Sequence, residues 1–190
     1  MKTADEYIES LRKIHFELYM FGERVTNIVD HPIIKPTINC VAATYELAEK
    51  PEFEPIMTAT SHLTGRKINR FCHIHQSIED LVSKSKMGRI LGAYTGSCFQ
   101  RCAGMDALNG LSIVTYDIDQ KYGTEYNKRF LRYVRYVQDE DLVCAAAMTD
   151  AKADRSLRPA DQPDPDQYLH VVGERSDGIV VRGAKLHLTG

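Results

Sequence analysis

The chain has 190 residues, of which 43% are apolar and 26% charged, and its formal net charge is -2. This length allows one domain with a sizeable core, or one domain and part of a second. The small net charge, with acidic and basic residues interleaved, argues against nucleic acid as the main partner. No apolar run reaches the roughly 18 residues of a membrane span, and the start MKTADEYIES lacks an apolar signal region. We therefore expect a cytoplasmic protein without a membrane partner.

Two helices are predicted near the start of the chain. Thr3 and Glu6 form a T-x-x-E capping box, which satisfies exposed backbone donors at a helix start. The apolar residues that follow recur at helical spacing: Tyr7, Leu11, Ile14, Leu18 and Phe21. This pattern predicts a helix that continues to Gly22. A second helix is predicted from just after Pro36 to about Glu49.

The middle of the chain is rich in apolar residues at helical spacing. Ser77 and Asp80 are placed to cap a short helix through Leu81. From Lys86 to about Ile118 a long, largely buried helix is expected, with Gly104 and Gly110 as the positions where it could break. Thr124 is the expected cap of a further helix. The predicted core face of that helix consists of Phe130, Leu131, Val134 and Val137.

The pattern changes after residue 140. Asp141 to Met148 is short and apolar, as in a buried strand, and 150–167 is a polar loop rich in Asp and Pro. Tyr168 to Val172 and Ile179 to Leu188 are expected strands, joined by a hairpin turn at Ser176–Gly178. The sequence thus predicts a mainly helical domain over 1–140 and the first strands of an incomplete β domain over 141–190. So few strands cannot bury a face alone, so we expect a second chain or a C-terminal region to complete the sheet.

The five cysteines are expected to be buried apolar residues, reactive thiols or metal ligands rather than disulfides, because their number is odd and no signal region precedes them. A packed thiol is the simplest interpretation for each one taken singly. On the expected helix, Cys98 and Cys102 would lie four residues apart on one face. Two thiolates so placed can hold a metal ion or two corners of an iron–sulfur cluster. The spacing alone is better explained by two small apolar residues on a core face, because a complete cluster needs four ligands.

Three other segments carry polar groups suited to binding. Cys72–His75 lacks a second ligand pair, which favours a loop whose histidine forms a hydrogen bond or serves a nearby active site over a zinc site. The basic run from Lys128 to Arg135 is typical of a solvated helix face, although it could also meet cofactor phosphates. Met148–Arg155 holds side chains able to bind a heterocycle and a pyrophosphate. Without the glycines of a dinucleotide-binding turn, a polar turn is the simpler interpretation, and Thr189 has the same status.

Several stretches resemble known flavoproteins. Tyr7–Arg12, Tyr19–Arg24 and Asp30–Pro32 resemble the opening of the 4-hydroxyphenylacetate 3-hydroxylase superfamily. Four further stretches resemble the 4-hydroxybutyryl-CoA dehydratase family within it: Ile68–Ser77, Ser97–Ala107, Tyr116–Thr124 and Asp177–Gly190. The resemblance covers essentially the whole chain. The cysteine pair is its specific part, because the hydroxylases of the superfamily lack it.

The resemblance implies a fold, cofactors and site residues. The implied fold is acyl-CoA-dehydrogenase-like, with a helical N-terminal domain followed by a middle β domain, in a homotetramer that binds FAD and a [4Fe–4S] cluster. Cys98 and Cys102 match two cluster ligands. The positions that match flavin contacts are Met148, Thr149, Asp150, Lys152, Arg155 and Thr189. The other cluster ligands and the catalytic residues are expected in a C-terminal region that this sequence does not contain.

The implied activity is that of a lyase and isomerase in 4-aminobutyrate metabolism. It converts 4-hydroxybutyryl-CoA to crotonyl-CoA and also isomerises the Δ double bond of vinylacetyl-CoA. Two alternatives remain open. One is a flavin-dependent aromatic 3-hydroxylase of the same superfamily, and the other is a truncated, inactive interaction or assembly domain. In every case we expect the isolated chain to be inactive, with acyl-CoA turnover requiring further polypeptide.

Overall fold

The computed structural model describes residues 1–186. Six α-helices and short two-stranded antiparallel sheets make up this part of the chain, which confirms the mainly helical prediction. The fold divides into two compact units, residues 1–145 and the residues from 146 onward. No helix within 1–186 combines the length and the apolar character that crossing a bilayer requires.

The first helix, α1 (Ala4–Arg12), begins at the predicted capping box. The Thr3 hydroxyl accepts a hydrogen bond from the Glu6 backbone at 3.1 Å, and the Glu6 carboxylate accepts one from the Thr3 backbone at 2.8 Å. The predicted continuation to Gly22 is wrong. Instead, β1 (Tyr19–Met20) and β2 (Glu23–Arg24) form a hairpin whose turn residues, Phe21 and Gly22, have positive φ angles of 52° and 85°. Ile14 and Phe21 are exposed, so this part of the apolar stripe has no core to pack against.

The second helix, α2 (Lys35–Glu49), has Pro36 in its first turn, close to the predicted bounds. Its Tyr45 ring stacks on Tyr7 of α1 with centroids 5.0 Å apart. This stack lies in a core cluster between the two helices: Tyr7, Val29, Ile38, Val41, Ala42 and Tyr45. The short helix α3 (Glu54–Met57) follows, and then β3 (Thr58–Thr60) pairs antiparallel with β4 (Lys67–Asn69). The 3₁₀ turn η1 (Arg70–Cys72) continues directly from β4.

The next helix, α4 (Ile78–Thr95), starts at the predicted Ser77 cap, whose hydroxyl accepts from the Asp80 backbone at 3.2 Å. It runs far beyond Leu81 and ends at Gly96, which adopts a left-handed conformation with φ 62°. The single helix expected from Lys86 to Ile118 is therefore wrong, because residues 96–101 separate α4 from α5 (Cys102–Tyr122).

The break does not fall at either expected glycine. Gly104 remains helical, and at this position α5 packs tightly against the backbone that follows α6. A Cβ atom at Gly104 would lie 1.9 Å from the carbonyl oxygen of Cys144, so only glycine allows this contact. Gly110 is also helical, with nothing near its Cβ position.

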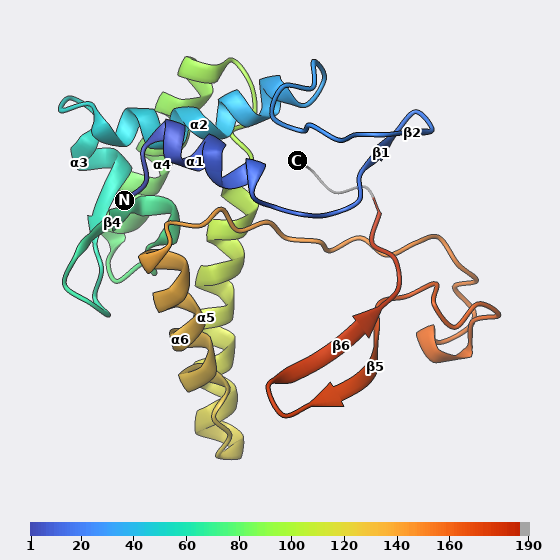
Figure 1. The fold of residues 1–190 in the computed structure, drawn as a ribbon. Helices are drawn as coiled ribbons and strands as arrows, with labels where there is room; N and C mark the ends of the chain where they lie inside the picture. Colours follow the sequence, from blue (N-terminus) through green and yellow to red (C-terminus); the bar gives the residue numbers. More distant parts are fainter. Residues whose placement is uncertain (187–190) are drawn as a thin grey trace. The chain divides into compact units, whose positions relative to one another are not determined.

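The last long helix, α6 (Tyr126–Asp139), lies antiparallel beside α5 (Figure 1). Its predicted face is confirmed: Phe130, Val134 and Val137 are buried in one core cluster, and the partly buried Leu131 packs against it. The predicted Thr124 cap is wrong. The Asp119 carboxylate accepts hydrogen bonds from the backbone of Tyr126 and Asn127, each at 2.8 Å, and from the Thr124 hydroxyl at 2.6 Å. A residue of the preceding helix thus caps α6.

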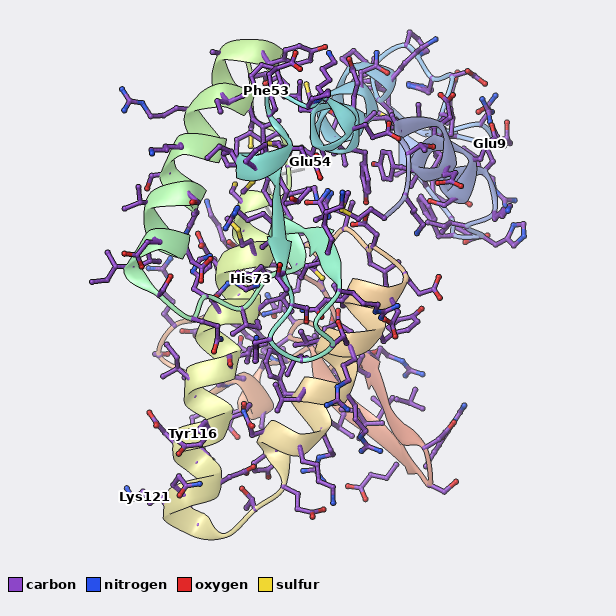
Figure 2. The ribbon with its side chains drawn as sticks, turned by 90° about the vertical axis from the view of Figure 1, so that its left-hand side faces the viewer. Glu9, Phe53, Glu54, His73, Tyr116 and Lys121 are labelled. Atoms are coloured by element: carbon purple, nitrogen blue, oxygen red, sulfur yellow. The ribbon has the colours of Figure 1, made fainter. Side chains whose placement is uncertain are left out.

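The core of residues 1–145 lies where these helices meet. One cluster joins α2, α3, η1, α4 and α5: Leu47, Ala48, Met57, Phe71, Met87, Leu91 and Met105. A second joins β4, η1 and the residues after it to α5 and α6: Ile68, Cys72, Ile74, Leu108, Phe130, Val134 and Val137. The far half of α5 is less covered. Figure 2 shows Tyr116 and Lys121 on this half, and both side chains are exposed.

The buried strand expected from Asp141 to Met148 is wrong. These residues follow α6 without regular structure, and Asp141 has a positive φ of 42°. The Leu142 carbonyl accepts a hydrogen bond from the Arg101 side chain at 3.2 Å instead of from the backbone of a neighbouring strand.

In the second unit, residues 150–167 form the expected loop, interrupted by a 3₁₀ turn, η2 (Pro159–Asp161). The predicted hairpin is confirmed: β5 (His170–Arg175) pairs antiparallel with β6 (Gly178–Arg182) around Ser176 and Asp177. The first strand begins two residues later than expected, and β6 ends at Arg182. The last residues of the second expected strand lie outside the described part of the chain.

Candidate functional site

The two candidate ligands, Cys98 and Cys102, lie at the junction between α4 and α5. Cys98 belongs to the non-helical segment 96–101, and Cys102 is the first residue of α5. Their predicted placement on one turn of a continuous helix is therefore wrong. The two thiols still influence one another: burial raises the pKa of Cys102, and the neighbouring Cys98 thiol raises it further.

The start of α5 is a suitable place for anionic sulfur. The backbone N–H groups of Ala103 and Cys102 lower the pKa of the Cys102 thiol, opposing the larger effect of burial. Unpaired N–H groups at a helix start carry partial positive charge and favour a thiolate. Both cysteines are free and only partly buried.

The pair alone cannot saturate a metal cluster. Within residues 1–186, no group of three or more His, Cys, Asp or Glu side chains is arranged to hold a metal ion. A cubane cluster needs four ligands. Among the described residues, the two thiols could therefore provide only two of these four ligands.

In the sequence, a buried arginine lies between these cysteines, immediately before Cys102. The Arg101 side chain is 1% exposed, and its guanidinium stacks between the rings of Tyr45 and Phe71, 4.6 and 4.8 Å from their centroids. It lies 3.6 Å from the buried Asp141 carboxylate. Sequence reasoning missed Arg101. The available signal was a charged residue within an apolar stretch, flanked by the two candidate ligands.

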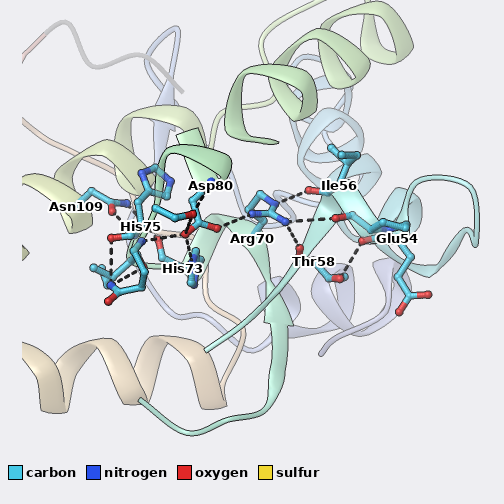
Figure 3. Close-up of polar contacts among 12 residues, drawn as sticks. Glu54, Ile56, Thr58, Arg70, His73, His75, Asp80 and Asn109 are labelled. Atoms are coloured by element: carbon cyan, nitrogen blue, oxygen red, sulfur yellow. Dashed lines mark hydrogen bonds and ion pairs between the residues drawn. The ribbon is translucent and has the colours of Figure 1, made fainter. Parts of the chain in front are cut away.

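A second polar network surrounds Asp80 at the start of α4 (Figure 3). Arg70 and His73 contact the carboxylate at 3.2 and 3.1 Å. Burial acts to raise the pKa of Asp80, but the Gln76 backbone, His73 and Arg70 together outweigh it and lower the pKa to about 2. The Arg70 guanidinium also donates to the carbonyls of Ile56 and Thr58, each at 2.6 Å.

This network gives one histidine of the Cys72–His75 motif a hydrogen-bonding role, one of the two roles expected. His73 is held by Asp80, and the His75 backbone donates to Asn109 at 2.8 Å. Burial raises the pKa of the Cys72 thiol to about 12, so the group is held neutral and is a poor metal ligand. Burial, followed by the charge of Lys84, lowers the pKa of His75.

The basic residues of α6 form an exposed helix face, as expected. Lys128 pairs with Glu125 at 2.9 Å, and the Arg129 guanidinium lies 4.8 Å from the centre of the Tyr126 ring. Arg132 and Arg135 line a shallow groove between α5 and α6. Such a face is typical of solvent contact, and its predicted contact with cofactor phosphates stays a prediction.

The predicted flavin segment belongs to the second unit. Met148 and Thr149 are exposed, and the Asp150 carboxylate forms an ion pair with Lys185. The Lys185 ammonium also donates to the Met148 carbonyl at 3.2 Å, while the Leu186 backbone donates to the Thr149 carbonyl at 2.9 Å.

The remaining members of the predicted flavin segment are less constrained. Lys152 and Arg155 are exposed, and the Lys152 carbonyl accepts from Gln167 at 2.6 Å. Thr189 lies outside the described residues. The structure thus brings Thr149 and Asp150 beside Lys185 and Leu186.

Comparison with known proteins relates the whole chain to two kinds of enzyme. A 4-hydroxybutyryl-CoA dehydratase/vinylacetyl-CoA-Delta-isomerase of Clostridium aminobutyricum is 57% identical over 190 residues, which are all of this chain and 39% of the relative. The oxygenase component of 4-hydroxyphenylacetate 3-monooxygenase from Thermus thermophilus is 29% identical over 188 residues, 99% of this chain and 38% of that protein. The chain therefore spans about two fifths of the length of these relatives.

Solved structures show the same relationship. An oxygen-tolerant archaeal 4-hydroxybutyryl-CoA dehydratase from N. maritimus matches 98% of this chain and 37% of its own, with 52% identity and a TM-score of 0.91. The oxygenase component HpaB, complexed with FAD and 4-hydroxyphenylacetate, matches 98% of this chain and 38% of its own, with 26% identity and a TM-score of 0.78. The family described as "4-hydroxyphenylacetate 3-hydroxylase N terminal" matches residues 3–190, and the chain belongs to this family.

Proposed function

We propose that this chain is the N-terminal part of a dehydratase that converts 4-hydroxybutyryl-CoA to crotonyl-CoA and isomerises vinylacetyl-CoA. The observation that carries the proposal is the 57% identity to the Clostridium relative over the whole chain, against 29% to the Thermus hydroxylase component. The paired thiols of Cys98 and Cys102 at the start of α5 support the same assignment. They are a feature for which a flavin hydroxylase has no use.

The proposal assigns a binding role to each unit. Cys98 and Cys102 would hold a [4Fe–4S] cluster as two thiolate ligands, and each thiol would give up its proton on binding. The α5 N-terminus favours the negative charge on Cys102. The flavin contacts are assigned to the second unit, at Met148, Thr149, Asp150, Lys152, Arg155 and Thr189. When bound, the cluster supplies a Lewis-acidic iron for the departing hydroxyl group and FAD supplies an electron acceptor.

Further polypeptide completes the proposed enzyme. The other cluster ligands and the catalytic residues come from a C-terminal region or a second chain, and the assembled protein is a cytoplasmic homotetramer. We assign an acyl-CoA-dehydrogenase-like arrangement, with the helical domain over 1–140 and the first strands of the middle β domain over 141–190. The likeness to FAD-bound HpaB structures over 98% of this chain supports the flavin assignment.

The test combines this chain with the C-terminal region of the Clostridium relative and purifies the assembly without oxygen. Iron, sulfide and flavin are measured, together with crotonyl-CoA formed from 4-hydroxybutyryl-CoA. We expect Cys98→Ala and Cys102→Ala to abolish iron and turnover while flavin remains. Cys40→Ala is the matched control, since Cys40 is also a free, partly buried thiol but lies on α2.

Each other outcome points to a different protein. Flavin without iron in the parent, with oxygen-dependent hydroxylation of a phenol, would replace the proposal with the aromatic hydroxylase. A folded, colourless assembly that binds neither cofactor would favour an interaction or assembly domain.

A further inference from the structure

We propose that Arg101 is the positioning residue for the two thiols: its buried guanidinium fastens the segment between Cys98 and Cys102 to the core, so that both sulfurs are held on one side of the α5 N-terminus. The inference rests on the proposed function, which makes the cysteine pair cluster ligands. The position of the two thiols is a property of this chain alone and can be measured without iron.

The partners of Arg101 come from three separate elements of residues 1–145. Its guanidinium donates to the Thr44 hydroxyl of α2 at 2.9 Å and to the Leu142 carbonyl after α6 at 3.2 Å. It also donates to the Cys72 sulfur of η1 at 3.8 Å. One side chain at the start of α5 therefore joins α2, η1 and the segment that follows α6.

The network is reinforced by contacts among these partners. The Tyr45 hydroxyl donates to the Asp141 carbonyl at 2.9 Å, while its ring stacks on the guanidinium. Phe71, on the other side of the guanidinium, also contacts Phe99 with ring centroids 5.5 Å apart. Phe99 and Arg101, the residues on either side of Gln100, therefore both contact the Phe71 ring.

The backbone between the cysteines requires such fastening. Gln100 has a φ of 58°, in the left-handed region that residues with a side chain rarely adopt. Such conformations persist when surrounding contacts determine them. The contacts of Phe99 and Arg101 with Phe71 hold this turn from both sides, between the two cysteines.

A buried charge is a costly way to fill a core. An ion pair in the interior is often replaceable by apolar side chains without loss of stability, and the Nε of Arg101 is buried without a partner among the described residues. The hydrogen bonds of the guanidinium go to Thr44, Cys72 and Leu142 rather than to Cys98 or Cys102. Arg101 therefore contributes to the site by holding the segment between the two cysteines in place, not by contacting their sulfurs.

The experiment measures the proximity of the two thiols in the iron-free chain. The 190-residue chain is purified without oxygen and treated with dibromobimane, which becomes fluorescent when it bridges two neighbouring thiols, and mass spectrometry locates the bridge. We expect rapid bridging of Cys98 and Cys102 in the parent. In Arg101→Met the bridging rate should fall about tenfold or more, since small displacements of a positioned group have large effects on rate. Arg101→Lys should behave like Arg101→Met, because a lysine ammonium lacks the planar guanidinium that stacks between two rings and donates several hydrogen bonds at once.

Arg70→Met is the matched control. Arg70 is a second buried arginine of the same unit, but its partners are Asp80 and the carbonyls of Ile56 and Thr58. It should lower the melting temperature and leave the bridging rate unchanged. If Arg101→Met does not fold, Thr44→Val removes one guanidinium bond and should reduce bridging by a smaller factor in a folded protein.

Two results would overturn the inference. One is bridging at the parental rate in a folded Arg101 variant or, if neither Arg101 variant folds, in Thr44→Val. The other is equal loss of bridging in Arg70→Met, which would mean that any loosening of the core separates the thiols. Iron content of the assembled protein is measured in parallel. A parent that bridges its thiols but takes up no iron would reject the dehydratase proposal and leave the positioning role intact.

Discussion

Residues 1–145 and residues 146–186 bury their side chains to very different degrees. In the first unit, apolar residues of the helices and their connecting segments form three core clusters, and Arg101 and Asp141 are also buried. Among residues 146–186, only Gln162 is buried, and the apolar side chains of Val171, Ile179 and others along the hairpin are exposed. Proposed ligands therefore lie in both a well-packed unit and a sparsely packed one.

The difference bears on how each part of the proposed site is formed. The cysteine pair is attached to a core that this chain supplies itself. The flavin segment is held by backbone hydrogen bonds and the Asp150–Lys185 pair, beside a hairpin that is too small to be stable by its own burial. We expect the first part to be preformed and the second to gain its final geometry from a ligand or from further polypeptide.

The largest expected effect compares one leucine from each unit. Leu47 is 0% exposed and Leu169 is 46% exposed. Leu47→Ala should lower the free energy of unfolding by about 3 kcal/mol, because it removes buried methyl groups and leaves a cavity. Leu169→Ala should change it by less than about 0.5 kcal/mol. Urea denaturation followed by circular dichroism measures both. Equal losses would show that the second unit shares a cooperative core with the first.

The next effect compares two glycines of α5. Gly104→Ala should cost about 2 kcal/mol of unfolding free energy, because the added Cβ would overlap the Cys144 carbonyl and force the backbone apart. Gly110→Ala should instead gain up to about 1 kcal/mol, since alanine favours the helix and nothing lies near its Cβ. The same denaturation assay applies. A neutral Gly104→Ala would mean that the segment after α6 packs less tightly than the structure shows.

Acid should weaken the first unit through Asp80. Its pKa is lowered to about 2, whereas an unfolded aspartate titrates near 3.9, so the folded state favours the carboxylate. The stabilisation, about 2 kcal/mol, should be full above roughly pH 5 and be lost as the pH falls toward about 2. Unfolding free energies of the parent and Asp80→Asn should therefore differ at pH 6 and converge toward pH 2. A difference that stays constant with pH would exclude this origin.

Local sequence signals predicted several elements of both units. The capping box at Thr3, the Ser77 cap, the proline near the start of α2 and the turn at Ser176–Gly178 all depend on residues a few positions apart. The core face of α6 followed from periodicity alone. These features need no knowledge of the rest of the fold.

The failures share a dependence on distant residues. The stripe from Ile14 to Phe21 looked helical, but no core lies beside it. Asp119 caps α6 from another helix, and the Leu142 carbonyl bonds to Arg101 instead of a strand. For the candidate site, the sequence pointed to the cysteine pair but predicted a continuous helix, whereas Cys98 lies in a non-helical segment before α5. The role of Arg101 required the positions of Tyr45 and Phe71, which no local pattern contains.

The smallest expected effect on stability concerns the Asp150–Lys185 pair of the second unit. Both groups are partly exposed, and exposed ion pairs contribute about 0.5 kcal/mol or less. Lys185→Gln should therefore leave the unfolding free energy nearly unchanged. Because Lys185 also holds the Met148 carbonyl, the substitution should displace the proposed flavin segment and weaken flavin binding in the assembled protein by about tenfold.

Arg182→Gln provides the control, since Arg182 is an exposed cation of the same hairpin that pairs with Asp166 at 3.7 Å. It should affect neither stability nor flavin affinity. Flavin titration by fluorescence, with urea denaturation in parallel, separates the two effects. If Lys185→Gln binds flavin as tightly as the parent, residues 148–150 are a polar turn and the flavin contacts lie elsewhere. If it binds less tightly at unchanged stability, the sparsely packed unit positions its ligand through single polar contacts, whereas the first unit positions the cysteine pair through its core.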